Sequence, residues 1–171
     1  MRGHVILSHG LNSSPAATKV SAMAKVAEAM GWTTERPDYS DIDARGDIAE
    51  VSARLERLLD RAQDASRPLV LAGSSMGAFI SGLASLEVEC VGLFLLAPPI
   101  VLEGYPRSLD AELIPTTVIH GWDDELIPAG DVVRWAQARN DRLILLDDSH
   151  RLERHVDFCA EEFGRFLAAL K

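Results

Sequence analysis

The chain has 171 residues, of which 47% are hydrophobic and 25% are charged. This size and composition are typical of one globular domain with its own core, and they exclude a disordered protein, a fibrous repeat and a disulfide-rich miniprotein. The formal net charge is −9, whereas binding to phosphate backbones or anionic membranes favours the opposite sign. We therefore expect neither nucleic acid nor a membrane as a partner.

The two cysteines and the apolar stretches indicate the compartment. Cys90 and Cys159 lie inside apolar patterns without ligand spacing, so we interpret them as small buried hydrophobic residues. The first nine residues lack the long apolar run of a signal peptide, and the apolar stretch 91–102 is too short for a membrane span. We expect a cytoplasmic protein, whose oligomeric state the sequence leaves open.

Short apolar segments rich in Val, Ile and Leu recur along the chain, and most of them lack polar alternation. Continuous apolar runs are typical of strands buried on both faces of a parallel sheet. A more polar candidate is expected at a sheet edge. The apolar segments are 4–8, 68–72, 90–96, 116–119 and 142–146, and the polar one is 32–36.

Helical periodicity fills the gaps between these segments. Apolar residues recur at steps of three and four in 20–30, which ends at Gly31, and in 48–62 and 156–170. In the middle helix we place four charged residues on the outer face, namely Glu50, Arg54, Arg57 and Arg61. The alternation predicts one three-layer α/β/α domain over residues 1–171, built on a mostly parallel sheet of about six strands.

Ligands of such sheets bind beyond the carboxyl ends of the strands. There, Gly73-Ser74-Ser75-Met76-Gly77 follows a strand and precedes a helical stretch, which is the context of a nucleophile elbow. We predict Ser75 as the nucleophile, with the Met76 N–H as a donor to developing negative charge. The alternative is a plain glycine-rich turn, and Ser74 is expected to point away.

A serine hydroxyl needs a base, and the base needs an orienting acid, here expected in the chain order Ser, Asp or Glu, His. Asp124, with Asp123 as its rival, follows the strand 116–119, and His150 follows the strand 142–146. The alternative for His150 is a solvated loop histidine. Its position after the last strand favours the base.

The loop after the first strand is expected to supply the second oxyanion donor. Gly10 would let the backbone turn inward, so that the Leu11 N–H faces the Ser75 oxygen. The alternative is a helix entry, with a serine at 13 or 14 as cap and Pro15 at the first helical position. Both can hold, because a cap would order the same loop.

Other polar residues receive structural interpretations. We expect His9 to be structural, and Asp147 and Asp148 to lie at a hydrated rim or to cap a turn. The sequence contains no histidine pair with metal-ligand spacing and no glycine-rich phosphate-binding motif. We therefore expect neither a metal nor a cofactor.

Segments 9–15, 73–77, 120–128 and 148–150 together resemble the α/β-hydrolase superfamily over nearly the whole chain. Within it, the sequence is most similar to small, lidless bacterial esterases of the YqiA-like group. The resemblance implies a minimal serine-hydrolase fold, selects Asp124 as the triad acid, and implies Leu11 and Met76 as the oxyanion donors. The chain departs from the family in its missing antiparallel edge hairpin and in the connection 97–115, which is too short for a cap domain.

We therefore expect a carboxylesterase-like serine hydrolase that cleaves small acyl esters. Pro98, Ile100, Leu102 and Tyr105 are expected to form a low apolar wall beside Ser75, and an open site suits short acyl groups. A thioesterase or amidase with the same triad, or a non-catalytic protein-binding module on this scaffold, are the alternatives.

Overall fold

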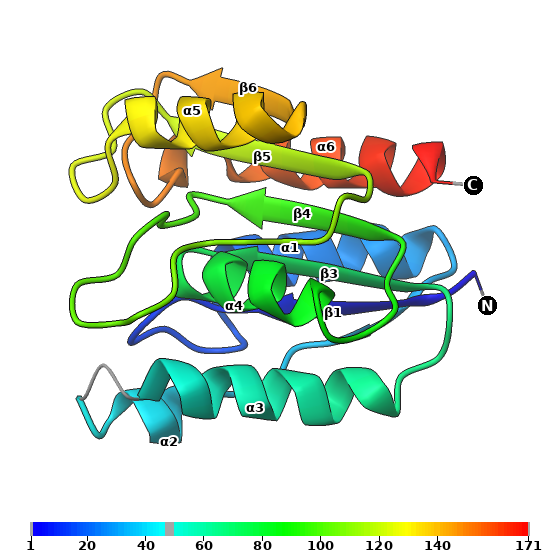
Figure 1. Ribbon diagram of the computed structural model, residues 1–171. Helices are drawn as coiled ribbons and strands as arrows, with labels where there is room; N and C mark the ends of the chain where they lie inside the picture. Colours follow the sequence, from blue (N-terminus) through cyan, green and yellow to red (C-terminus); the bar gives the residue numbers. More distant parts are fainter. Residues whose placement is uncertain (1, 47–49, 171) are drawn as a thin grey trace.

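A six-stranded sheet, in which every neighbouring pair of strands is parallel, forms the centre of the computed structural model. The structure describes residues 2–46 and 50–170. In the order β2-β1-β3-β4-β5-β6, the strands are β2 (Thr33–Glu35), β1 (His4–Ser8), β3 (Leu69–Ser74), β4 (Gly92–Leu96), β5 (Thr116–Gly121) and β6 (Arg142–Leu146). The polar segment lies at an edge, as predicted. Because every neighbouring pair is parallel, the carboxyl ends of all six strands lie on one side of the sheet; the arrowheads of β4 and β6 in Figure 1 mark this side.

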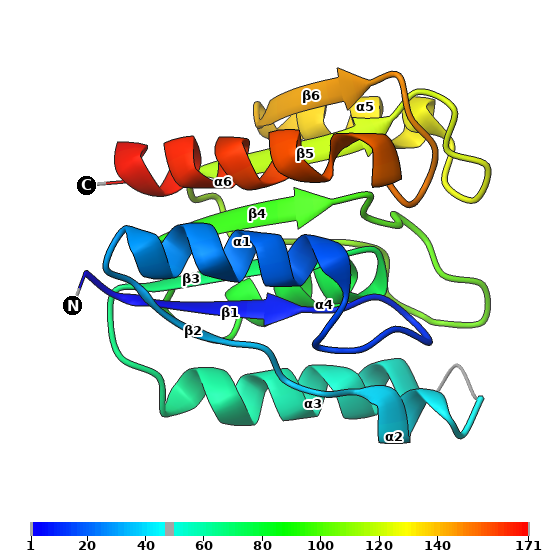
Figure 2. The same cartoon turned by 180° about the vertical axis from the view of Figure 1, so that it is seen from behind.

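Helices cover both faces of the sheet (Figures 1 and 2). One face carries α1 (Thr18–Ala29) and α6 (Val156–Ala169), and the other carries α3 (Glu50–Gln63), α4 (Met76–Ser85) and α5 (Ala129–Arg139). A short α2 (Ser40–Asp43) precedes α3, and a 3₁₀ turn (Glu153–His155) precedes α6. Each face encloses its own core, with Phe79 in one and Phe94 and Phe163 in the other. The predicted three-layer fold is confirmed.

The buried side of α3 differs from the prediction. Arg54, which we placed on the outer face, is 1% exposed, and its guanidinium lies 2.8 Å from the Asp43 carboxylate. Arg54 follows Val51 by three residues and precedes Leu58 by four, so it shares their face of the helix. A charge can be buried there because a partner compensates it. The predicted helical residues 48 and 49 lie outside the described residues.

The first helix also begins later than the predicted entry. Its first residue is Thr18, and no side chain caps it. The N–H of Ala17 instead donates to the Ser14 carbonyl at 3.0 Å, so the residues predicted as the cap form a turn before the helix. The predicted end is confirmed, because Gly31 follows the helix with a φ of 91°.

Two further expectations concern the cysteines and the connection after β4. Cys159 is buried and Cys90 is half-buried, and both are free. Burial raises the pKa of the Cys159 thiol to about 12 and that of Cys90 to about 11. Residues 97–115 contain neither helix nor strand, so no cap domain folds there. None of the described helices is long and apolar enough to cross a membrane.

Candidate active site

Ser75 lies in a strained turn between β3 and α4. Its φ of 55° and ψ of −117° are rarely adopted by residues with a side chain. Glycine is required on both sides because the chain passes so close to itself. A Cβ at Gly73 would lie 2.3 Å from the Gly77 backbone, and one at Gly77 would lie 2.0 Å from the Ser8 carbonyl oxygen. The packing of α4 against the sheet therefore demands the small residues of the G-x-S-x-G pattern.

Three side chains from three strand ends form a hydrogen-bonded chain. Ser75 Oγ lies 2.9 Å from His150 Nε2, and His150 Nδ1 lies 2.8 Å from Asp124 Oδ2. A carboxylate only accepts hydrogen bonds, so the Nδ1 atom carries the proton. The Nε2 lone pair is then free to accept the Ser75 hydroxyl proton, as a general base does.

The Asp124 side chain is fully buried, and both oxygens of its carboxylate accept hydrogen bonds. Its Oδ1 accepts hydrogen bonds from the N–H groups of Leu126 and Ile127, at 2.9 and 2.7 Å. Burial alone would raise the pKa of Asp124, but the hydrogen bonds from His150, Ile127 and Leu126 hold that pKa below its usual value. Asp124 is thus an ionised carboxylate in a fixed position. Its rival Asp123 is exposed.

His120 lies behind this carboxylate and is completely buried. Its Nε2 atom donates to the Ile127 carbonyl at 2.9 Å and lies 3.3 Å from Asp124 Oδ2. Burial lowers the pKa of His120, so the neutral ring is favoured. The Nδ1 atom has no hydrogen-bond partner in the part of the chain that the structure describes.

The loop that carries His150 is organised by a buried carboxylate, Asp148, whose hydrogen bond to His155 was not predicted. Asp148 is 1% exposed and accepts hydrogen bonds from the N–H groups of Ser149 and Arg154 and from Nδ1 of His155, at 2.8 to 3.0 Å. Burial opposes ionisation, but these hydrogen bonds lower the pKa of Asp148. Of the two expectations for Asp148, the hydrated rim is wrong, because the loop folds over it, and the turn cap is confirmed, because the carboxylate accepts from the N–H groups of Ser149 and Arg154.

Other contacts hold the same loop from neighbouring elements. The His150 N–H donates to the Glu125 carboxylate at 3.2 Å, and Lys19 of α1 donates to the Arg151 carbonyl. Asp147, by contrast, is 84% exposed, as expected for a rim residue. Glu125 is one residue from Asp124 in the acid loop, but only the fold brings its side chain to the base.

The loop after β1 lies directly against the elbow. A Cβ built on Gly10 would be 3.6 Å from Ser75 Cβ. The next N–H, that of Leu11, and the N–H of Met76, the first residue of α4, have no acceptor among the described residues. Two backbone N–H groups, one in this loop and one at the start of α4, are therefore free to donate to a bound ligand.

His9 is buried and both ring nitrogens bind the backbone. Nδ1 donates to the Gly10 carbonyl at 2.7 Å, and Nε2 accepts from the Tyr39 N–H at 2.9 Å. Burial, with a smaller contribution from Arg54, lowers the pKa of His9. A neutral ring with both nitrogens engaged is structural, which confirms the interpretation from the sequence.

The predicted apolar wall lies on the α4 side. Ile100, Leu102 and Tyr105 pack against the core that contains Phe79, and Pro98 is buried. The Tyr105 ring meets the Phe79 ring nearly edge-on, at 5.8 Å between centroids.

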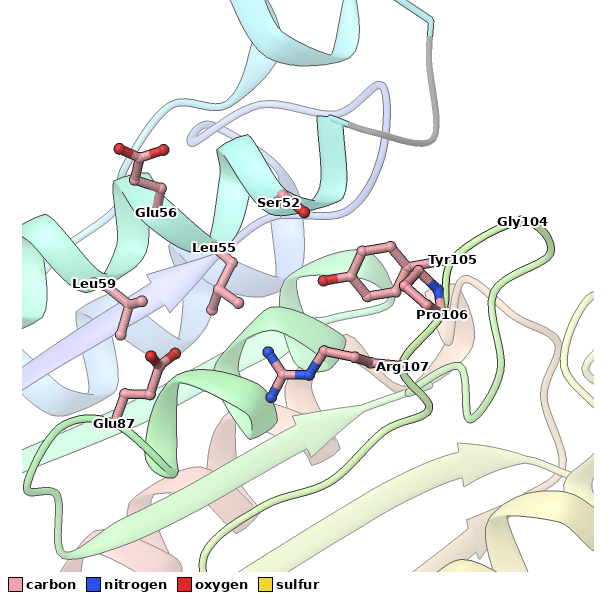
Figure 3. A pocket seen from close by; sticks show the side chains of 9 residues that line it. All are labelled: Ser52, Leu55, Glu56, Leu59, Glu87, Gly104, Tyr105, Pro106 and Arg107. Carbon is pink, nitrogen blue, oxygen red and sulfur yellow. The ribbon is translucent and has the colours of Figure 1, made fainter.

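Tyr105 also lines a pocket of about 630 Å³ between α3 and the connection after β4 (Figure 3). Leu55 and Leu59 contribute the opposite wall from α3. Neither Ser75 nor His150 lines this pocket. Tyr105 therefore contacts α4 and faces α3 across this pocket.

The described residues contain no group of three or more His, Cys, Asp or Glu side chains that could hold a metal ion. The groups that the fold brings to the carboxyl edge are a hydroxyl, an imidazole, a carboxylate and two backbone donors. Together they can perform nucleophilic acyl chemistry.

Comparison with known proteins identifies the family. No protein-family model and no protein of curated function matches the sequence. Among solved structures, a protein from Xanthomonas campestris pv. campestris assigned to the alpha/beta hydrolase superfamily is 50% identical, with a TM-score of 0.96, over 99% of this chain and all of its own.

Two more distant structures share the fold. Mouse alpha/beta hydrolase domain-containing protein 10 is 20% identical, with a TM-score of 0.76, over 98% of this chain and 92% of its own. An α/β serine hydrolase without a lid from Xanthomonas campestris is also 20% identical, with a TM-score of 0.65, over 96% of this chain and 81% of its own. Taken with the 50% identical relative and the parallel sheet, these findings show that the chain belongs to the α/β-hydrolase superfamily.

Proposed function

We propose that the protein is a serine hydrolase that cleaves small acyl esters through a Ser75–His150–Asp124 triad. The observation that carries this proposal is the continuous chain of short hydrogen bonds, 2.9 Å from Ser75 to His150 and 2.8 Å from His150 to Asp124. The strained elbow that presents Ser75 supports it, because such backbone strain is concentrated at functional sites.

The reaction follows from the protonation states. Ser75 Oγ attacks the ester carbonyl while His150 Nε2 takes the hydroxyl proton, and Asp124 stabilises the imidazolium that forms. The carbonyl oxygen becomes an oxyanion and accepts hydrogen bonds from the Leu11 and Met76 N–H groups. His150 returns the proton to the leaving alcohol. A water molecule, activated by the same histidine, then hydrolyses the acyl-enzyme.

Small acyl esters are proposed because apolar side chains are exposed on the loops at the carboxyl edge, where Ser75 lies, and no cap domain covers them. Besides the wall of Pro98, Ile100, Leu102 and Tyr105, several large apolar side chains are exposed on loops at the carboxyl edge. These are Leu11 after β1, Val101 after β4, and Trp122 and Leu126 after β5. They offer contact area to a short acyl chain or an aromatic alcohol. No domain folds from residues 97–115 to cover a longer chain.

The test is hydrolysis of p-nitrophenyl acetate and butyrate, with labelling by a fluorophosphonate probe. Ser75→Ala is expected to fold and to lose both turnover and labelling. Ser74→Ala is the matched control, because Ser74 is the adjacent buried serine and precedes the elbow. Turnover that survives in Ser75→Ala would contradict the proposal.

The same assay compares the alternatives. Matched esters, thioesters and amides of one acyl group separate the three activities, and we expect the ester to give the highest kcat/KM. A folded wild-type protein that neither labels nor turns over any of the three would favour a non-catalytic binding module.

A further inference from the structure

We propose that Arg54, held by Asp43, is a positioning residue that orients the Gly10–Leu11 peptide so that the Leu11 N–H faces the reacting oxygen. This inference rests on the proposed function, because it assigns Arg54 a role in that reaction. Arg54 lies in α3, which runs alongside the loop after β1 (Figure 2). Among the described residues its hydrogen bonds go to Asp43, His9 and Gly10 and not to Ser75 or His150, so it acts through the backbone of that loop.

The Arg54 guanidinium is enclosed and its donors converge on one loop. Its side chain is 1% exposed and that of Asp43 is 2% exposed. Nε and Nη2 bind the two Asp43 oxygens at 2.8 and 3.2 Å. Nη1 and Nη2 reach the His9 carbonyl at 3.3 and 3.2 Å, and Nη2 reaches the Gly10 carbonyl at 3.1 Å. A planar group with several donors can hold such a set of acceptors at once, which a lysine cannot.

Asp43 extends the same restraint to the far end of the loop. Its Oδ2 atom accepts a hydrogen bond from the Asn12 N–H at 3.0 Å. Asn12 has a φ of 58°, a left-handed conformation that most residues with a side chain avoid and that asparagine tolerates better than most. The Arg54–Asp43 pair therefore holds the loop on both sides of Leu11.

The orientation of the Gly10–Leu11 peptide explains how these contacts would act on the reaction. The Gly10 carbonyl accepts from Arg54 Nη2 at 3.1 Å, His9 Nδ1 at 2.7 Å and the Ser13 N–H at 3.2 Å. In a trans peptide the C=O and the following N–H point in opposite directions. Three donors fix the Gly10 oxygen on the side of Arg54 and His9, so the Leu11 N–H points away from them. We take that direction to be the Ser75 side, because a Cβ on Gly10 would lie 3.6 Å from Ser75 Cβ.

The positive charge adds to this orientation. Donors at the carbonyl oxygen polarise the peptide and strengthen the hydrogen bond that its N–H can donate. A buried ion pair by itself is weak evidence for stability, since apolar residues of similar volume often replace it without loss. The convergence of Arg54 on two loop carbonyls is explained by the preorganisation of an oxyanion donor.

The test replaces both members of the pair, as Arg54→Met/Asp43→Leu, because a single substitution would leave a buried charge unpaired and could prevent folding. The matched control is Arg57→Met/Asp41→Leu. Arg57 is one turn from Arg54 on the same helix and binds Asp41 through two hydrogen bonds, at 2.6 and 3.0 Å, and the Asp38 carbonyl at 2.8 Å. Asp41 is exposed and Arg57 is half-buried, and neither side chain hydrogen-bonds to the described residues of the loop after β1.

Steady-state kinetics with p-nitrophenyl butyrate provide the first readout. We expect the Arg54/Asp43 variant to keep its KM and to lose about 10²- to 10³-fold in kcat, as when one oxyanion donor is lost. The Arg57/Asp41 variant is expected to stay within about threefold of the wild type, as for a surface pair outside the site. A trifluoromethyl ketone, whose adduct with the serine carries an oxyanion, should lose affinity by a factor similar to the loss in kcat/KM.

The outcomes separate this inference from the function on which it rests. No Ser75-dependent turnover in the wild-type protein would refute the proposed function. Wild-type turnover that a folded Arg54/Asp43 variant retains within about threefold would overturn only the role of Arg54. A loss that appears in KM, with unchanged kcat and inhibitor affinity, would overturn it as well, because orientation of the Leu11 N–H acts on the transition state.

Discussion

Replacing Asp124 by asparagine would exchange one oxygen of the buried carboxylate for an NH2 group and keep the shape of the side chain. Oδ1 is held by the N–H groups of Leu126 and Ile127, so the amide oxygen would occupy that position. The NH2 group would then face His150 in place of Oδ2. It can only donate, so His150 Nδ1 would have to accept and the ring proton would move to Nε2.

This change of tautomer places a proton where the base needs a lone pair. His150 Nε2 lies 2.9 Å from Ser75 Oγ, and a protonated Nε2 cannot take the hydroxyl proton. Where a triad keeps its geometry but has the wrong tautomer, kcat falls by about 10⁴-fold, which is a rise of about 5 kcal/mol in the activation barrier. Stability should change far less, by about 1 kcal/mol, because the fold keeps most of the hydrogen bonds.

The assay is kcat/KM for p-nitrophenyl acetate, with thermal unfolding to show that the Asp124→Asn variant is folded. Asp123→Asn is the matched control, because the adjacent carboxylate is exposed, and we expect it to retain activity. An Asp124→Asn variant that keeps more than about a tenth of the wild-type rate would refute the tautomer argument. A large loss in Asp123→Asn alone would assign the acid to the other aspartate.

Three further predictions test the supports of the site. Gly77→Ala should destabilise the protein by about 1–3 kcal/mol and impair turnover, because the new Cβ would lie 2.0 Å from the Ser8 carbonyl oxygen and backbone must move. Asp148→Asn should lower kcat by about tenfold to a hundredfold through displacement of the His150 loop, because one amide oxygen cannot replace the two carboxylate oxygens that accept from three donors. For His120, whose pKa burial lowers from 6.5, the unfolded state binds more protons below that pH. The free energy of unfolding should therefore fall as the pH drops below 6.5 and level off below the folded-state pKa, and it should fall less in His120→Gln.

Each of these has its own measurement and control. Thermal unfolding compares Gly77→Ala with Gly130→Ala, whose Cβ would meet only the mobile end of Arg134, and equal stability in the two would contradict the clash. Kinetics compare Asp148→Asn with Asp147→Asn, which changes an exposed side chain, and equal rates would contradict a role for Asp148. Urea unfolding at pH 7.5 and 5.5 tests the prediction for His120. If the free energy of unfolding falls equally in the wild type and in His120→Gln, the prediction is wrong.

Local patterns of apolar residues in the sequence predicted most of the architecture. Apolar runs without alternation predict buried parallel strands, and steps of three and four predict the helices between them, because backbone geometry fixes these periods. The nucleophile candidate was visible for the same reason, since a tight turn with a close helix crossing requires glycine at 73 and 77. The positions of Ser75, Asp124 and His150 after three of the predicted strands indicated that their side chains would share one edge of the sheet.

The amino-acid sequence predicted the set of elements, the edge where the polar groups collect and the residue types available there. Which of those groups meet depends on the packing of the whole domain. This packing joined His150 to Asp124 rather than Asp123, folded a loop around Asp148, and turned Arg54 inward against Asp43 and the loop after β1. Spacing along the chain reveals which face of an element a residue occupies, but the partner that makes a buried charge tolerable comes from a distant segment, and its position depends on how all the layers pack.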